Sequence, residues 1–266
     1  MGYKIKIQID QMILAFKVIL APMLIGFVSI AGRRWGPTVG GWLVSLPLTS
    51  APVILFLAIE QGTAFASSAA QNTLMGIISV ASFCLVYYWF SFRFGWPLSM
   101  LAGWIAFFAL TFIEESLILP LLFSFLAVTA FLIVVLKIMP KSQDKSPALS
   151  SPSWDTPLRM IVATGFVLGL TGAASILGPQ LSGLLAPFPM FTTILAVFTH
   201  HFQGAYSARR LLRAVVAGSF TFVTFFLVIS LVINRWGIAA AFSLALLAAF
   251  ATHSALLFLI NRNSND

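Results

Sequence analysis

The sequence predicts an all-α polytopic membrane protein with about nine transmembrane helices, arranged as two inverted four-helix repeats joined by a linking helix. Of the 266 residues, 60% are hydrophobic and 8% are charged, against roughly 45–50% and 25% in an ordinary soluble domain. The apolar residues also come in runs of about 20, the length that crosses the hydrocarbon core of a bilayer. A third observation is that one stretch of the chain recurs later in it.

Glycine, proline and charged residues bound the predicted spans. The first repeat, residues 11–113, contains the spans 11–31, 38–59, 70–91 and 97–113. Only Glu114 and Glu115 separate the fourth span from the linking span, 116–138, so a tight turn is expected there. Residues 140–157 contain four prolines and five serines, which predicts a cytoplasmic linker. The second repeat, residues 159–260, contains the spans 159–177, 181–202, 211–233 and 238–260.

The basic residues indicate the orientation of the chain. With nine spans, eleven of the 15 Lys and Arg residues fall in loops on one side, and the positive-inside rule makes that side cytoplasmic. The N-terminus is then outside and the C-terminus cytoplasmic, as expected for a protein of the bacterial inner (plasma) membrane. The net charge of +8 is therefore attributed to topology and not to nucleic-acid binding. The single cysteine, Cys84, excludes an intramolecular disulfide.

The internal repeat is the strongest signal in the sequence. A shift of 142 positions, the distance from Gly36 to Gly178, superposes residues 36–62 on residues 178–204 with eight of 27 positions identical. Five of the eight are Gly or Pro, among them Pro47/Pro189 and Gly62/Gly204. Because one linking span separates two four-span units, the second unit enters the membrane from the opposite face. Inverted repeats of this kind are typical of secondary transporters.

The architecture resembles that of inverted-repeat secondary transporters with proline-broken helices, such as bile-acid symporter-like and cation/proton-antiporter-like proteins. The phrase GPxxGGxxxxLP followed by QG also looks like one found in small uncharacterised bacterial membrane proteins. The resemblance implies alternating access between the two repeats. It implies no coupling ion, because the spans lack the aspartate pair of the antiporters.

The repeated prolines predict a site near the middle of the membrane. Pro47 and Pro189 each lie about ten residues into a predicted span, or roughly 15 Å at helical rise, and each frees a backbone carbonyl. Such groups need partners in hydrocarbon, so a polar, substrate-binding cavity is expected. Its candidate residues are Ser45, Pro47, Thr49, Ser50, Pro187, Pro189, Thr192 and Thr193. Alternatively, the prolines only kink the helices and the hydroxyls bond to the freed carbonyls.

Titratable residues supply two further hypotheses. The candidates for proton coupling are Glu60, His200, His201 and His253, although a solvated group at a membrane face explains the first three equally well. Lys17 lies inside the first span and is expected either to reach the interface or to form a buried ion pair with Glu60, Glu114 or Glu115.

The sequence thus favours transport of a small solute, and convergence of two helix N-termini favours an anion. The alternatives are a lipid flippase or scramblase and a non-transporting membrane scaffold. No enzyme motif, Walker sequence or metal-ligand cluster is recognisable, so no catalytic residue, cofactor or metal is expected. The expected partners are membrane lipids and a small-molecule or lipid substrate, with no nucleic acid.

Overall fold

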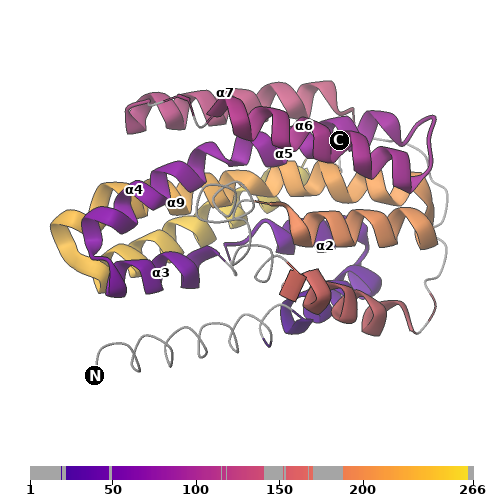
Figure 1. Ribbon diagram of the computed structural model, residues 1–266, viewed down its shortest axis with the longest axis horizontal. Coiled ribbons are helices and arrows are strands. Elements are labelled where there is room, and N and C mark those ends of the chain that lie inside the picture. Colours follow the sequence, from indigo (N-terminus) through magenta and orange to yellow (C-terminus); the bar gives the residue numbers. More distant parts are fainter. Residues whose placement is uncertain are drawn as a thin grey trace.

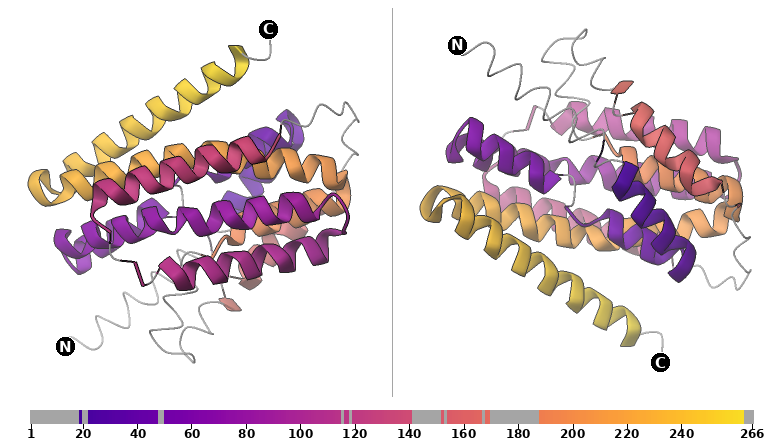
Figure 2. Two further views of the ribbon diagram at one scale, coloured as in Figure 1. Left: turned by 90° about the horizontal axis from the view of Figure 1, so that it is seen from above. Right: turned by 90° about the horizontal axis from the view of Figure 1, so that it is seen from below.

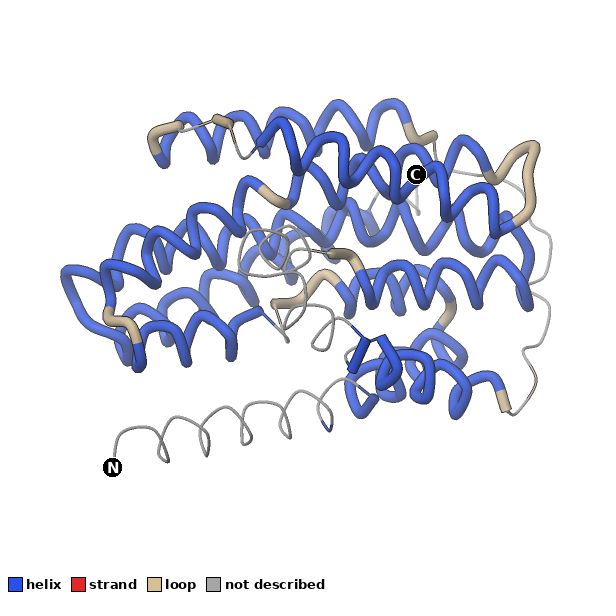
Figure 3. The backbone as a smooth tube through the Cα atoms, in the orientation of Figure 1, coloured by secondary structure: helices blue, strands red, loops and turns tan. Residues whose placement is uncertain are grey.

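The computed structural model is helical throughout its described part (Figure 3). It describes residues 19, 22–47, 50–114, 116–117, 119–140, 152, 154–166, 168–169 and 188–262, with side chains as far as Leu256. Thr49, Pro187, Lys17 and Glu115, among the predicted site residues, lie outside this part.

The described residues of the first half of the chain form seven helical segments. Residues 22–35 form a helix that ends before Gly36, whose positive φ of 97° allows the chain to reverse. Pro37, in the first turn of the next helix, costs nothing because the N–H groups there have no partner within the helix. The helices that follow are α2 (Pro37–Val44), α3 (Ser50–Glu60), α4 (Thr63–Met75), α5 (Ile77–Phe90), α6 (Trp96–Glu114) and α7 (Leu121–Ile138).

The second half contains a helix over residues 155–166 and the long element α9 (Met190–Arg262). Gly204, with φ 87°, and Gly237, with φ 77°, interrupt the helical backbone of α9. The element is therefore three helical stretches, 190–203, 205–236 and 238–262, and the chain reverses direction at each glycine (Figure 1).

Four helical elements are long and apolar enough to cross a membrane: Thr63–Phe90, Trp96–Glu114, Leu121–Ile138 and Met190–Leu256. The polytopic membrane class is therefore supported, whereas the nine spans and the repeat architecture stay predictions. The span predicted at 38–59 is two helices, α2 and α3, separated near Pro47. The expected turn at Glu114 is present, because α6 ends there and α7 begins at Leu121.

Apolar side chains cover the outer helices where lipid would contact them. On α6 the exposed residues recur every three or four positions, which places them on one face of the helix; they are Leu98, Leu101, Ile105, Phe108 and Phe112. Trp35, Trp89, Trp154 and Trp236, all exposed, lie close to helix ends, as the tryptophans of an interfacial belt do.

The 205–236 stretch of α9 runs through the middle of the bundle beside α4, α5 and α7, whereas the last stretch crosses at an angle (Figures 1 and 2). Glycines allow α2 to lie directly against it. A Cβ at Gly41 would collide with the Leu211 carbonyl and lie 2.9 Å from the Ala214 Cβ, and a Cβ at Gly218 would collide with the Ser45 side chain. At Gly165 and Gly169, by contrast, no described atom lies within 4 Å of a Cβ.

The predicted linker ends earlier than expected. Residues 155–157 belong to the helix 155–166 and not to a loop, and Asp155 and Thr156 are buried. Pro157 does not prevent this because it lies in the first turn of the helix, where proline is tolerated.

Candidate functional site

The first helix break lies between α2 and α3. The Ser45 and Leu46 N–H groups bond to Trp42 and Leu43 in tight turns, and α3 begins at Ser50. The Pro47 carbonyl accepts a hydrogen bond from the Ala51 N–H at 2.9 Å. Pro47 thus caps the helix that follows it, and the N-terminal end of α3 faces the interior of the bundle (Figure 1).

At the second predicted break, the helix that starts after Pro189 carries the same backbone hydrogen bond, and the residues that precede Phe188, 170–187, lie outside the described part. Phe188 and Pro189 are not helical, α9 begins at Met190, and the Pro189 carbonyl accepts a hydrogen bond from the Thr193 N–H at 2.8 Å. Pro189 and Thr193 are the repeat partners of Pro47 and Ala51 at the offset of 142. The following glycines also match, since Gly62 has φ 90° and ψ 167° and Gly204 has φ 87° and ψ 165°.

The predicted hydroxyl groups at the breaks are mostly buried. Ser45 is 4% exposed and its hydroxyl donates to the Trp42 carbonyl at 2.6 Å. Thr192 and Thr193 are also buried, and the Thr193 Oγ1 accepts a hydrogen bond from Trp104 Nε1 at 3.3 Å. Ser50, at the start of α3, is half-buried.

Aromatic rings surround the second break. Phe188 packs against Trp104, with ring centroids 5.4 Å apart, and stacks on Phe108 and Phe166. Phe107 adds an edge contact at 5.7 Å. The interior beside Pro189 is therefore apolar on the side of α6, and the hydroxyls of Thr192 and Thr193 are the polar groups there.

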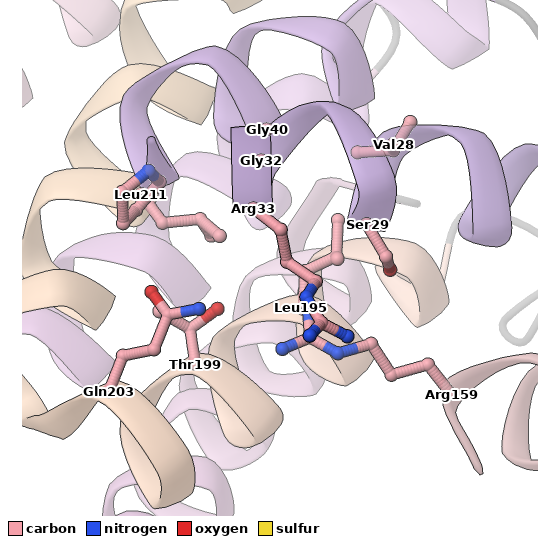
Figure 4. Close-up of a pocket in the computed structure, with 11 residues that line it drawn as sticks. Val28, Ser29, Gly32, Arg33, Gly40, Arg159, Leu195, Thr199, Gln203 and Leu211 are labelled. Carbon is pink, nitrogen blue, oxygen red and sulfur yellow. The ribbon is translucent and has the colours of Figure 1, made fainter. Parts of the chain in front are cut away.

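A polar cavity of about 10 Å³ lies elsewhere, at the end of the bundle that carries Arg33, Arg93, Lys137 and Arg159 (Figure 4). Its size is about the minimum for one water molecule. Five helical segments line it: 22–35, α2, 155–166 and the 190–203 and 205–236 stretches of α9. The polar side chains that line it are Ser29, Arg33, Arg159, Thr199 and Gln203.

Charge and burial distinguish this cavity. Arg159 is 3% exposed and forms a bidentate ion pair with the fully buried Asp155, at 2.8 and 2.9 Å. Its guanidinium also lies 5.3 Å from the ring centre of Phe198. Arg33 Nη1 donates to Thr156 Oγ1 at 3.3 Å, and both guanidinium groups reach the same region (Figure 4). The Ser29 Oγ is buried, with no hydrogen-bond partner among the described residues.

The sequence interpretation overlooked this cavity, although the sequence carried two signals for it. The offset of the repeat pairs Arg159 with Lys17, a second basic residue inside a predicted span, and pairs Gln203 with Gln61. In the sequence, Arg33 and Arg159 were counted only among the basic residues that indicate the orientation of the chain. Their proximity depends on how helices from the two halves of the chain pack, and the spacing of residues along the sequence does not predict that packing.

The four candidate residues for proton coupling lie in different environments. Nδ1 of His253 lies 3.3 Å from Thr221 Oγ1, and its ring packs on Trp42 at 5.4 Å, three residues before Ser45 and the first break. Nδ1 of His200 lies 3.2 Å from the hydroxyl of the buried Tyr87. His201 and Glu60 are exposed. Glu60 thus ends α3, His200 and His201 lie in the 190–203 stretch of α9, and His253 contacts α2 from the last stretch of α9.

Glu114 is half-buried at the end of α6. Its predicted partner Lys17 and its neighbour Glu115 lie outside the described residues, so the predicted ion pair stays a prediction. Glu114 Oε1 is buried with no hydrogen-bond partner among the described residues, and one turn before it the Thr111 hydroxyl donates to Ser79 at 3.0 Å. Within the described chain no three His, Cys, Asp or Glu residues form a group that could hold a metal ion.

The arginines at 209–213 hold helix ends together. Arg213 donates to the carbonyls of Leu136 and Met139 at the end of α7. Arg209 donates to the Ser91 carbonyl after α5 and lies 4.1 Å from the ring centre of Phe92. Cations at helix C-termini are favourable because the free carbonyls carry partial negative charge. These two arginines therefore have structural roles beside any role in topology.

Comparison of the chain with protein-family models, with curated proteins and with solved structures gives no match.

Proposed function

We propose that the protein is a secondary transporter of a small anionic solute in a bacterial plasma membrane, working by alternating access between two inverted repeats. The observation that carries the proposal is the pair of helix breaks. Pro47 and Pro189 occupy equivalent positions at an offset of 142, and each caps an interior helix start with the same backbone hydrogen bond.

The directions of the two broken helices support an inverted relationship. From the interior, α3 runs to one end of the bundle, where the chain turns at Gly62. The 190–203 stretch of α9 runs to the opposite end, where the chain turns at Gly204 (Figure 1). Two similar units inserted in opposite senses have an inward-open and an outward-open arrangement of nearly equal energy.

The interior helix starts favour an anion as the solute. A helix N-terminus carries about half a positive charge, from N–H groups that lack partners. Discontinuous helices in other transporters direct such ends at anionic substrate groups. Here the side chains nearest the two starts are Ser50, Thr192 and Thr193, which bring hydroxyl donors and no carboxylate.

His253 is the residue that we assign to proton coupling. It contacts Trp42 on the broken helix and Thr221 in the middle of the 205–236 stretch. Protonation would place a charge between these two elements, so the position of α2 against α9 would depend on it.

Cysteine accessibility tests the proposal. In a Cys84→Ser background, Ser50→Cys and Thr192→Cys should react with a charged, membrane-impermeant methanethiosulfonate, because alternating access opens the interior to one face and then the other. Ile105→Cys is the matched control, since this residue lies midway along α6 and is 62% exposed on the outer surface of the bundle, where lipid excludes the reagent. If neither interior cysteine reacts in folded protein, while both react after denaturation, the breaks are only kinks and the proposal is wrong.

A further inference from the structure

We propose that Ser79, Thr111 and Glu114 form a binding site for a sodium ion between α5 and α6. This inference goes beyond the proposed anion transport, because it concerns a ligand of the opposite charge and its binding does not require movement of the repeats.

The three residues lie far from either end of a membrane-spanning element. Thr63–Phe90 is one of the elements that are long and apolar enough to cross a membrane, and Ser79 is 16 residues from its first residue and 11 from its last, or roughly 24 and 17 Å at helical rise. The Thr111 hydroxyl donates to the Ser79 hydroxyl at 3.0 Å, so the end of α6 lies at the same level. An ionisable residue at such a depth is a candidate for a functional site.

Glu114 carries a negative charge that no described side chain neutralises. Its Oε1 is buried with no hydrogen-bond partner among the described residues. Ser79, whose hydroxyl and backbone both interact with the Glu114 carboxyl, is an uncharged residue. It belongs to the first turn of α5, where N–H groups lack helical partners, so this contact holds the carboxylate in place without removing its charge. Because a buried charge is costly unless it is paired, a bound cation would complete the cluster.

The oxygen atoms of the cluster suit a hard cation of single charge. Ser79 and Thr111 are 0% and 6% exposed, and each hydroxyl oxygen has two lone pairs that can face an ion. Together with Oε1 of Glu114 they offer three oxygen ligands, the type that hard cations prefer. A divalent ion would leave one positive charge unpaired. Within the described chain no group of three His, Cys, Asp or Glu residues is present, which argues against a transition metal at this place.

Binding of radiolabelled sodium to the purified protein in mild detergent tests the site. Sodium chloride replaces N-methylglucamine chloride at constant ionic strength, and the dissociation constant for sodium is measured at equilibrium. The wild type should bind sodium saturably. In Glu114→Gln the dissociation constant should rise by about tenfold or more, because a charge-assisted contact is lost. Without sodium this variant should be at least as stable as the wild type, since an unpaired buried charge has been removed.

Matched variants separate the site from general effects. Glu60→Gln makes the same charge change at an exposed carboxylate that ends α3, and it should leave the dissociation constant unchanged. Thr111→Val keeps the shape of the side chain but removes one oxygen ligand, so the dissociation constant should rise about threefold to tenfold. Thr164→Val is its control, because that hydroxyl donates to the Met160 carbonyl within its own helix.

Absence of sodium binding to the wild type overturns the proposal, and so do equal dissociation constants in Glu114→Gln and Glu60→Gln. If Glu114→Gln does not fold, an unchanged dissociation constant in Thr111→Val overturns it. A proton is the other cation that a carboxylate takes. If the wild type binds no sodium while its melting temperature changes with pH in a way that Glu114→Gln removes, the site binds a proton and the sodium proposal is wrong.

This test is independent of the proposed transport. Sodium binding is measured in detergent without a membrane gradient, so it can fail while the interior cysteines of the transport test react. Conversely, sodium can bind to a protein whose interior cysteines do not react.

Discussion

At the scale of single residues, the ion pair between Arg159 and Asp155 makes a direct prediction. Both side chains are buried, at 3% and 0% exposure, and both carboxylate oxygens are engaged. Removing one partner of such a pair leaves an unpaired buried charge and costs about 3–5 kcal/mol. We expect Asp155→Asn and Arg159→Met each to lower the melting temperature of the detergent-solubilised protein strongly.

The double variant Asp155→Leu/Arg159→Met separates charge from packing. Replacing both charges with apolar groups is often close to neutral, so this variant should be more stable than Arg159→Met alone. The loss of stability in the double variant is compared with the losses in Asp155→Leu and Arg159→Met measured singly. If it equals their sum, the two side chains do not interact energetically.

The same residues show which features of single residues can be predicted from the sequence. Pro47 is predictable as a break, because proline interrupts a helix whatever surrounds it. The pairing of Arg159 with Asp155 is compatible with helical spacing of four residues, but the serines and prolines around Asp155 indicated a linker. Only the packing of helix 155–166 against its neighbours distinguishes a buried pair from a solvated one.

At the scale of helices, the contact of α2 with the 205–236 stretch depends on Gly41. A Cβ there would collide with the backbone carbonyl of Leu211, which cannot move as a side chain does. Gly41→Ala should therefore destabilise the protein by about 1–3 kcal/mol, the usual cost of overpacking. The change should appear as a lower melting temperature in detergent.

Gly165→Ala is the matched control for this prediction. Gly165 is also helical, and no described atom lies within 4 Å of a Cβ at that position. Because alanine favours a helix over glycine by about 1 kcal/mol, this variant should be as stable as the wild type or more so. Equal losses in both variants would mean that the approach of α2 to α9 is not tight.

The helices also show where the spacing of residues along the sequence does not predict the packing. The two glycines that interrupt α9 were expected as span boundaries, and their positive φ values agree with that. By contrast, the sequence does not distinguish Gly41 from Gly165, yet among the described residues only a Cβ at Gly41 would contact another helix. A small residue permits a close approach, but whether a neighbour uses it depends on the tertiary arrangement.

At the scale of the whole molecule, the distribution of basic residues predicts how the bundle lies in the membrane. The turn between α5 and α6, the C-terminal end of α7 and the start of helix 155–166 lie at one end of the bundle, whereas the turn between α3 and α4 lies at the other end (Figure 1). Arg93, Lys137 and Arg159 belong to these first three segments, and Arg33 bonds to Thr156 in the third, so the positive-inside rule predicts that this end faces the cytoplasm. Alkaline phosphatase is active only outside, so fusions after residues 62 and 115 should be active and fusions after residues 145 and 210 silent.

This pattern also tests the inverted relationship of the two repeats. Residues 62 and 204 are equivalent at the offset of 142 and have the same backbone conformation, yet an odd number of crossings between them must place them on opposite faces. Activity after residue 62 together with silence after residue 210 is the result that an inverted pair requires. Equal activity at both positions would make the repeats parallel and would contradict the inverted architecture on which the proposed mechanism depends.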